Sequence, residues 1–95
     1  MNTYNMNTNN DIALEQKLMI KLVSNAMASG FTAYNLSAST LRELNEYTNK
    51  MNEYAEILIR CEYKTIMEVK ELVLGAYNNG YNQAKANHAN SQSIR

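Results

Sequence analysis

Two side chains in the sequence could act as a nucleophile or a general base. Cys61 is the only cysteine and His88 the only histidine. A thiolate nucleophile needs a base within hydrogen-bonding reach, and a metal ion needs several ligands at fixed geometry. His88 falls in the polar segment 87–95, which we expect to be a flexible tail. Cys61 is predicted to be a half-buried helix residue, so neither side chain predicts a catalytic or metal site.

The carboxylates are also spread out. A di-metal helical bundle needs a Glu-x-x-His pair, and the sequence has none. Two glutamates precede a basic residue by four positions, a spacing typical of solvated pairs on one helix. The three glycines form no phosphate-binding loop. The glutamates of the long helical stretch are Glu43, Glu46, Glu53, Glu56, Glu62, Glu68 and Glu71. We therefore predict that the chain is not an enzyme and binds no cofactor.

The charge balance bears on nucleic-acid binding. Nine basic and nine acidic residues give a net charge of zero, which disfavours binding to phosphate backbones or anionic membranes. The sequence of residues 31–44 resembles the pattern of a helix-turn-helix. The second helix, however, would present Arg42, Glu43, Glu46 and Lys50 to the DNA. Base reading usually requires Arg, Lys, Asn or Gln and several cations for phosphates. Nucleic acid is not the expected partner, and a helix-turn-helix regulator stays an alternative.

The composition indicates the compartment. A single cysteine excludes an intramolecular disulfide framework, and the N-terminus lacks a signal-peptide pattern. No apolar run approaches the roughly 20 residues that span a bilayer. We expect a cytoplasmic protein without a membrane segment. The many asparagines and the absence of tryptophan and proline are typical of small phage- or plasmid-encoded proteins, which would act in the cytoplasm of a host cell.

The elements that would position any functional residue are predicted to be helices, in an all-α fold. A flexible polar tail is expected over residues 1–10, and a single helical domain over residues 11–86. The first helix should span about residues 11–29, because Asp11 is a good N-cap and Gly30 is a typical residue after a helix end.

A longer helix is expected over about residues 41–77, because Thr40 and Glu43 match a capping box. Its apolar stripe rotates near residues 60–65. The helix is either continuous there or bent or broken, and we favour a continuous one, because no glycine or proline forces a break. A weaker pattern could extend it to residue 85. Gly75 and Ala76 mark a spot where another backbone could approach closely.

Helices of such different lengths cannot cover each other, so the sequence predicts that a second copy of the chain completes the fold as a homo-oligomer, a dimer or higher. The long helix is rich in tyrosine, which is enriched at interfaces. The leading hypothesis is a non-enzymatic protein-interaction module, an inhibitor or adaptor that binds and occludes a protein partner. An oligomer that sequesters a nucleotide-like ligand is the main alternative. The predicted interaction residues are Tyr47, Tyr54, Arg60, Tyr63, Lys64, Tyr77 and Tyr81.

Overall fold

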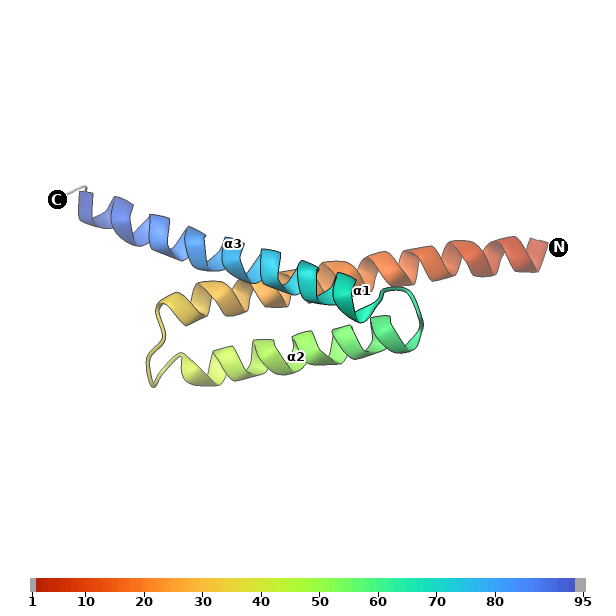
Figure 1. The fold of residues 1–95 in the computed structure, drawn as a ribbon, viewed down its shortest axis with the longest axis horizontal. Coiled ribbons are helices and arrows are strands. Elements are labelled where there is room, and N and C mark those ends of the chain that lie inside the picture. Colours follow the sequence, from red (N-terminus) through yellow and green to blue (C-terminus); the bar gives the residue numbers. More distant parts are fainter. Residues whose placement is uncertain (1, 94–95) are drawn as a thin grey trace.

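Three helices form the protein, and the first lies between the other two. The computed structural model describes the backbone of residues 2–93 and the side chains of residues 12–89. The helices are α1, Asn2–Tyr34; α2, Leu41–Arg60; and α3, Ile66–Ser93. The molecule is elongated, with extents of 65 × 25 × 21 Å. Helix α1 packs against both other helices, whereas α2 and α3 hardly touch and diverge toward the far end of α1 (Figure 1).

The all-α prediction is confirmed over the described residues, but the bounds of the first helix were wrong. Helix α1 begins at Asn2 and continues to Tyr34, past both limits of the expected span 11–29. Gly30 was predicted to follow the helix end and instead lies inside α1. The flexibility of residues 1–10 and 87–95 stays a prediction, and residues 1 and 94–95 lie outside the described part.

The favoured prediction of one continuous helix over residues 41–77 was also wrong, and the alternative of a break near residues 60–65 is confirmed, since the chain turns between α2 and α3. Helix α2 ends in a Schellman motif, in which two backbone N–H groups bond back to carbonyls of the last turn. The Glu62 N–H donates to the Ile59 carbonyl at 3.0 Å, and the Tyr63 N–H donates to the Leu58 carbonyl at 3.0 Å. Glu62 takes the left-handed conformation, with φ of 61°. The turn therefore needs no glycine or proline.

Helix α3 begins with a reciprocal capping box. The Thr65 N–H donates to Glu68 Oε1 at 2.9 Å, and the Glu68 N–H donates to Thr65 Oγ1 at 3.1 Å. The capping box expected at Thr40 is absent, because the Thr40 side chain makes no cap bond to α2. Its hydroxyl instead accepts the Ser37 N–H at 2.9 Å, within the connection between α1 and α2. The Thr-x-x-Glu pattern thus caps the start of α3 at residues 65–68. In the same pattern at residues 40–43, the threonine closes a turn in the connection instead.

The hydrophobic core lies where all three helices come together. Leu18 and Leu22 of α1, Leu58 of α2 and Val69 of α3 form its buried centre. Tyr63 packs against this cluster from the turn, which supplies the hydrophobic contact that usually accompanies a Schellman motif. From this core toward the C-terminal end of α1, α2 and α3 each pack against α1 and hardly touch each other.

The strained turn residue yields a first prediction. Glu62→Gly should stabilise the protein by about 1 kcal/mol, because glycine adopts the left-handed region without the Cβ clash of other residues. Glu53→Gly is the matched control. It makes the same change in the interior of α2 and should destabilise by about 1 kcal/mol. Urea titration measures both, and a destabilised Glu62→Gly variant would contradict the turn geometry.

The capping box makes stability depend on pH. The backbone N–H of Thr65 holds the pKa of Glu68 below its ordinary value of 4.5, helped by the Thr65 hydroxyl and by the charge of Lys64. The carboxylate therefore contributes stability that is complete above pH 4.5 and is lost as the pH falls through the lowered pKa. Glu68→Gln keeps the cap but cannot titrate. We expect the stability advantage of the wild type over Glu68→Gln to shrink on acidification, and an advantage that does not change with pH would refute this role.

Candidate interaction surface

Helices α1 and α3 cross so closely that two glycines are required. A Cβ atom built on Gly30 would clash with the Tyr77 carbonyl oxygen, and it would lie 2.8 Å from the Tyr77 carbonyl carbon and 3.0 Å from the Tyr81 nitrogen. A Cβ atom on Gly80 would clash with the Met27 carbonyl in the same way. The absence of a side chain at each glycine thus leaves room for the backbone of the other helix.

Small residues surround this crossing at four-residue spacing. Ala26 precedes Gly30 by one turn of α1, and Ala76 and Ala84 flank Gly80 on α3; all three alanines are buried. Small side chains at this spacing let two helix backbones approach closely. The spot predicted for close approach was Gly75 together with Ala76. Ala76 is buried at the crossing, whereas Gly75 faces away, because a Cβ atom there would meet no other part of the described chain within 4 Å.

The crossing holds aromatic rings at the far end of α1. The Tyr34 and Tyr81 rings meet edge to face, with centroids 5.2 Å apart. The His88 ring lies 6.0 Å from the Tyr34 ring, on the part of α3 that passes the end of α1. Tyr81 remains 39% exposed. Its ring is therefore both oriented by a neighbour and open to solvent.

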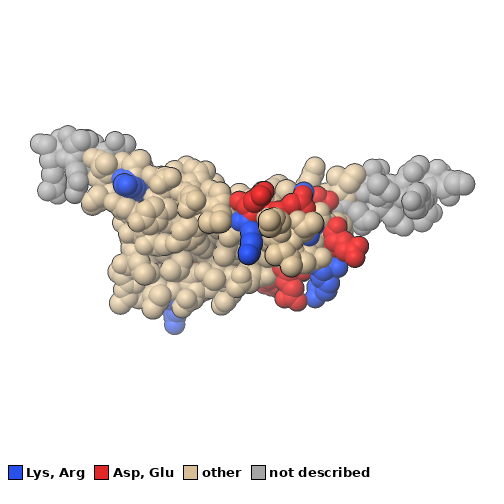
Figure 2. All heavy atoms as spheres, in the orientation of Figure 1, with Lys and Arg blue, Asp and Glu red and all other residues tan. Residues whose placement is uncertain are grey.

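Charged residues are confined mainly to the other end of the molecule. Residues 22–41 and 72–84 contain no charged side chain. Both segments lie at the α1–α3 crossing. Figure 2 shows the result on one face: acidic and basic groups gather near the turn between α2 and α3, while the opposite end is almost uncharged. A binding partner can therefore cover the uncharged end without removing charged groups from water.

A groove of about 410 Å³ opens on this uncharged end. Its floor is the side of α1 that carries Met27, Ala28 and Phe31. Tyr47 of α2 and Gln83 of α3 stand on its two sides. Because α2 and α3 diverge here, no third helix of the described chain covers this part of α1 (Figure 1).

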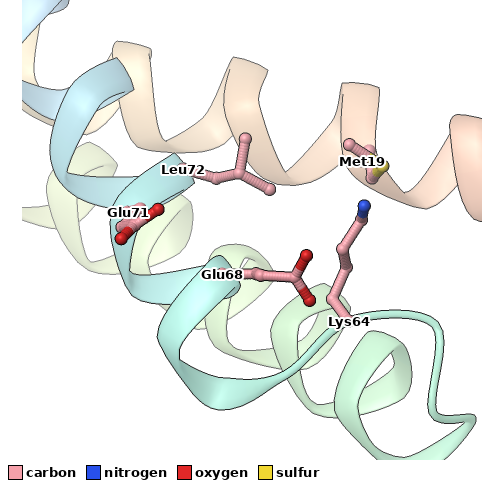
Figure 3. A pocket seen from close by; sticks show the side chains of 5 residues that line it. All are labelled: Met19, Lys64, Glu68, Glu71 and Leu72. Atoms are coloured by element: carbon pink, nitrogen blue, oxygen red, sulfur yellow. The ribbon is translucent and has the colours of Figure 1, made fainter.

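A second pocket, of about 280 Å³, lies at the charged end. Figure 3 shows Met19 of α1, Lys64 of the turn, and Glu68, Glu71 and Leu72 of α3 around it. The Lys64 ammonium lies 3.6 Å from a carboxylate oxygen of Glu15 on α1. The ion pair links the turn to α1, so the ammonium already has an anionic neighbour in this pocket.

The seven predicted interaction residues do not gather on one surface. Tyr54 and Tyr63 pack against the core, and Tyr77 lies at the glycine crossing. Arg60 pairs with Glu56 on α2 at 3.4 Å, and Lys64 pairs with Glu15. Tyr47, on the groove, and Tyr81, beside Tyr34, lie at the uncharged end together with Tyr77. Their roles in binding stay predictions.

Sequence reasoning missed two rows of exposed apolar residues. The first, here the α3 row, is Met67, Leu74 and Tyr81, which are 71%, 60% and 39% exposed. The second runs along α1 and includes Ile20 and Phe31, which are 66% and 39% exposed. Spacing of three, four and seven could have revealed both. The long-helix interpretation instead placed the α3 row on a continuation of α2, and the assumed helix end at Gly30 separated Phe31 from Ile20.

The nucleophile and base candidates are far apart. Cys61 is exposed at the end of α2, which corrects the expected half-buried position, and His88 lies near the opposite end of α3. Within the part of the chain that the structure describes, no group of three or more His, Cys, Asp or Glu residues could hold a metal ion. In the same part, every helix is too short or too polar to cross a bilayer.

Comparison with known protein families, with curated proteins and with solved structures found no match to this chain.

Proposed function

We propose that this protein is a non-enzymatic interaction module that binds a protein partner through the exposed face of α3. The observation that carries the proposal is the α3 row, in which Met67, Leu74 and Tyr81 follow one another at seven-residue spacing and are all exposed. A helix with such a row binds by laying it into an apolar groove of another protein. The partner class is therefore a protein with a hydrophobic groove about four helical turns, or roughly 21 Å, in length.

The chemistry of the α3 row suits binding. Methionine offers adaptable apolar surface, and tyrosine offers a large contact area with few rotatable bonds. The contact with Tyr34 restricts the Tyr81 ring before any partner arrives. A side chain that is already ordered loses less entropy on binding. Tyr81 is therefore expected to be the strongest single contact.

The arrangement of α1 and α2 speaks against the helix-turn-helix alternative. The two helices run side by side in opposite directions, joined by residues 35–40 (Figure 1). A DNA-reading pair instead meets at about 90–120° so that its second helix can enter the major groove. The ligand-sequestering alternative predicts a large thermal shift with one nucleotide-like compound and no bound protein.

The test is affinity capture from cells that carry the gene, with tagged wild-type protein and two variants. Leu74→Asp places a charge in the middle of the α3 row and should abolish capture of the partner. Asn79→Asp adds the same charge at an exposed position about 140° around α3 and should leave capture unchanged. Both variants should keep the wild-type circular dichroism spectrum. Equal loss in both variants, or capture that survives Leu74→Asp, would reject the α3 row as the binding face.

A further inference from the structure

The outer side of α1 carries a regular row of uncovered residues. Successive members are alternately four and three positions apart, the spacing that lines one face of a helix and forms the seam of a coiled coil. Each is exposed or half-buried. The row covers about 27 Å of helix. Its members, here the α1 outer row, are Ala13, Lys17, Ile20, Ser24, Met27 and Phe31.

The α1 outer row lies opposite the packed side of the same helix. The buried residues of α1 include Leu18, Leu22, Ala26 and Ser29, and Leu18 and Leu22 pack with Leu58 of α2 and Val69 of α3. Consecutive residues on a helix are about 100° apart, so Leu22 and Ile20 point to nearly opposite sides. Helix α1 thus uses one side to hold both neighbours, and the row with Ile20 at 66% exposure remains free.

We propose that a second copy of this chain covers the α1 outer row, with the two α1 helices antiparallel. The row is symmetric about position 22. A two-fold axis there places Ala13 opposite Phe31, Lys17 opposite Met27, and Ile20 opposite Ser24. Phe31 then meets Ala13 and Ile20 meets Ser24, a large side chain against a small one in each case, as close packing of two helices requires. Met27 meets Lys17, whose aliphatic stem can lie along it while the ammonium stays in water. The same patch serves both chains, as a two-fold interface demands.

The charges select the antiparallel orientation over the parallel one. In the sequence of α1 the charged residues Asp11, Glu15, Lys17 and Lys21 all precede residue 22, and residues 22–34 carry none. Antiparallel pairing sets the charged half of one helix against the uncharged half of the other. Parallel pairing would bring Lys17 against Lys17 and Lys21 near Lys21, and like charges placed together repel.

The groove at the uncharged end is part of the surface that the second chain would cover. Antiparallel pairing lays the segment around residues 13–17 of one chain over Met27, Ala28 and Phe31 of the other, between Tyr47 and Gln83. This inference goes beyond the proposed partner binding and uses a different helix, so either one can fail without the other.

Disulfide trapping tests the orientation directly. In a Cys61→Ser background, Lys17→Cys and Met27→Cys are combined in one full-length chain and oxidised under mild conditions. The two-fold arrangement predicts a closed dimer joined by two disulfides, which reducing agent returns to single chains. Lys17→Cys alone is the matched control, and it should give little cross-linked product because the two Lys17 positions are far apart in the antiparallel pair.

Three results would overturn the proposal. Efficient dimers from Lys17→Cys alone would indicate parallel pairing or random collision. A ladder of longer polymers from the double variant would indicate head-to-tail association. A product that stays monomeric, with the helical circular dichroism spectrum of the wild type, would show that α1 does not pair through this row.

Discussion

Gly30→Ala should lower the free energy of unfolding by about 3 kcal/mol, at the upper end of the usual cost of overpacking. The added methyl group would meet the carbonyl of Tyr77 and the backbone nitrogen of Tyr81, which belong to the other helix. Main-chain atoms cannot rotate aside as a flexible side chain can, so α1 and α3 would have to separate. Gly80→Ala should have a similar effect, because its neighbours are the backbone atoms of Met27 and Phe31.

Gly75→Ala is the internal control for this experiment. It makes the same substitution in α3 at a position with no atom within 4 Å of the new methyl group. Alanine favours the helix, so this variant should be more stable than the wild type by about 0.5–1 kcal/mol. Urea denaturation of the three variants measures the contrast. A Gly30→Ala protein as stable as Gly75→Ala would show that the helices do not cross at backbone contact.

The second large effect is expected in the core. Leu58→Ala should cost about 2–5 kcal/mol, because the leucine is 0% exposed and truncation leaves a cavity between three helices. Its carbonyl also accepts the N–H groups of Tyr63 and Lys64, so the turn to α3 is built on this residue. A small domain has only about 5–15 kcal/mol of total stability, and the variant is expected to unfold at much lower denaturant concentration.

Leu41→Ala gives the comparison for this substitution. Leu41 begins α2 and is 48% exposed, so the same truncation there should change stability by less than about 1 kcal/mol. Thermal denaturation followed by circular dichroism suffices to rank the two variants. Similar losses at both positions would contradict the placement of the core between Leu58, Leu22 and Val69.

The all-α fold was predictable from the sequence because it depends on local patterns. The start of α2 at Leu41 was also predicted, although the Thr40 capping box from which it was predicted does not form. The break between α2 and α3 also has a local signal, the Thr65-x-x-Glu68 capping box. The rotation of the apolar stripe left a break near residues 60–65 open, but a continuous helix was favoured because no glycine or proline forces a break there. Glu62 shows that a Schellman motif tolerates another residue in the left-handed region when packing holds it there.

The role of the glycines could not be read from local pattern. Gly30 and Gly80 have ordinary sequence surroundings for helix ends, yet both lie within helices. Their function depends on a contact between residues fifty positions apart. The candidate surfaces depend on the same contact, since the crossing decides which sides of α1 and α3 stay exposed. The interaction residues were predicted mainly from the tyrosine content of the long helix. Two of these tyrosines, Tyr54 and Tyr63, pack against the core instead.

The proposed pairing of two chains through the α1 outer row is tested most directly by sedimentation equilibrium. We expect the wild type to approach twice the mass of one chain as its concentration rises. Ile20→Asp, which charges the centre of the α1 outer row, should sediment as a single chain, while Asn45→Asp, at an exposed position on α2, should behave as the wild type. A wild type that keeps the mass of one chain up to millimolar concentration, or an Ile20→Asp variant that dimerises equally well, would contradict the account.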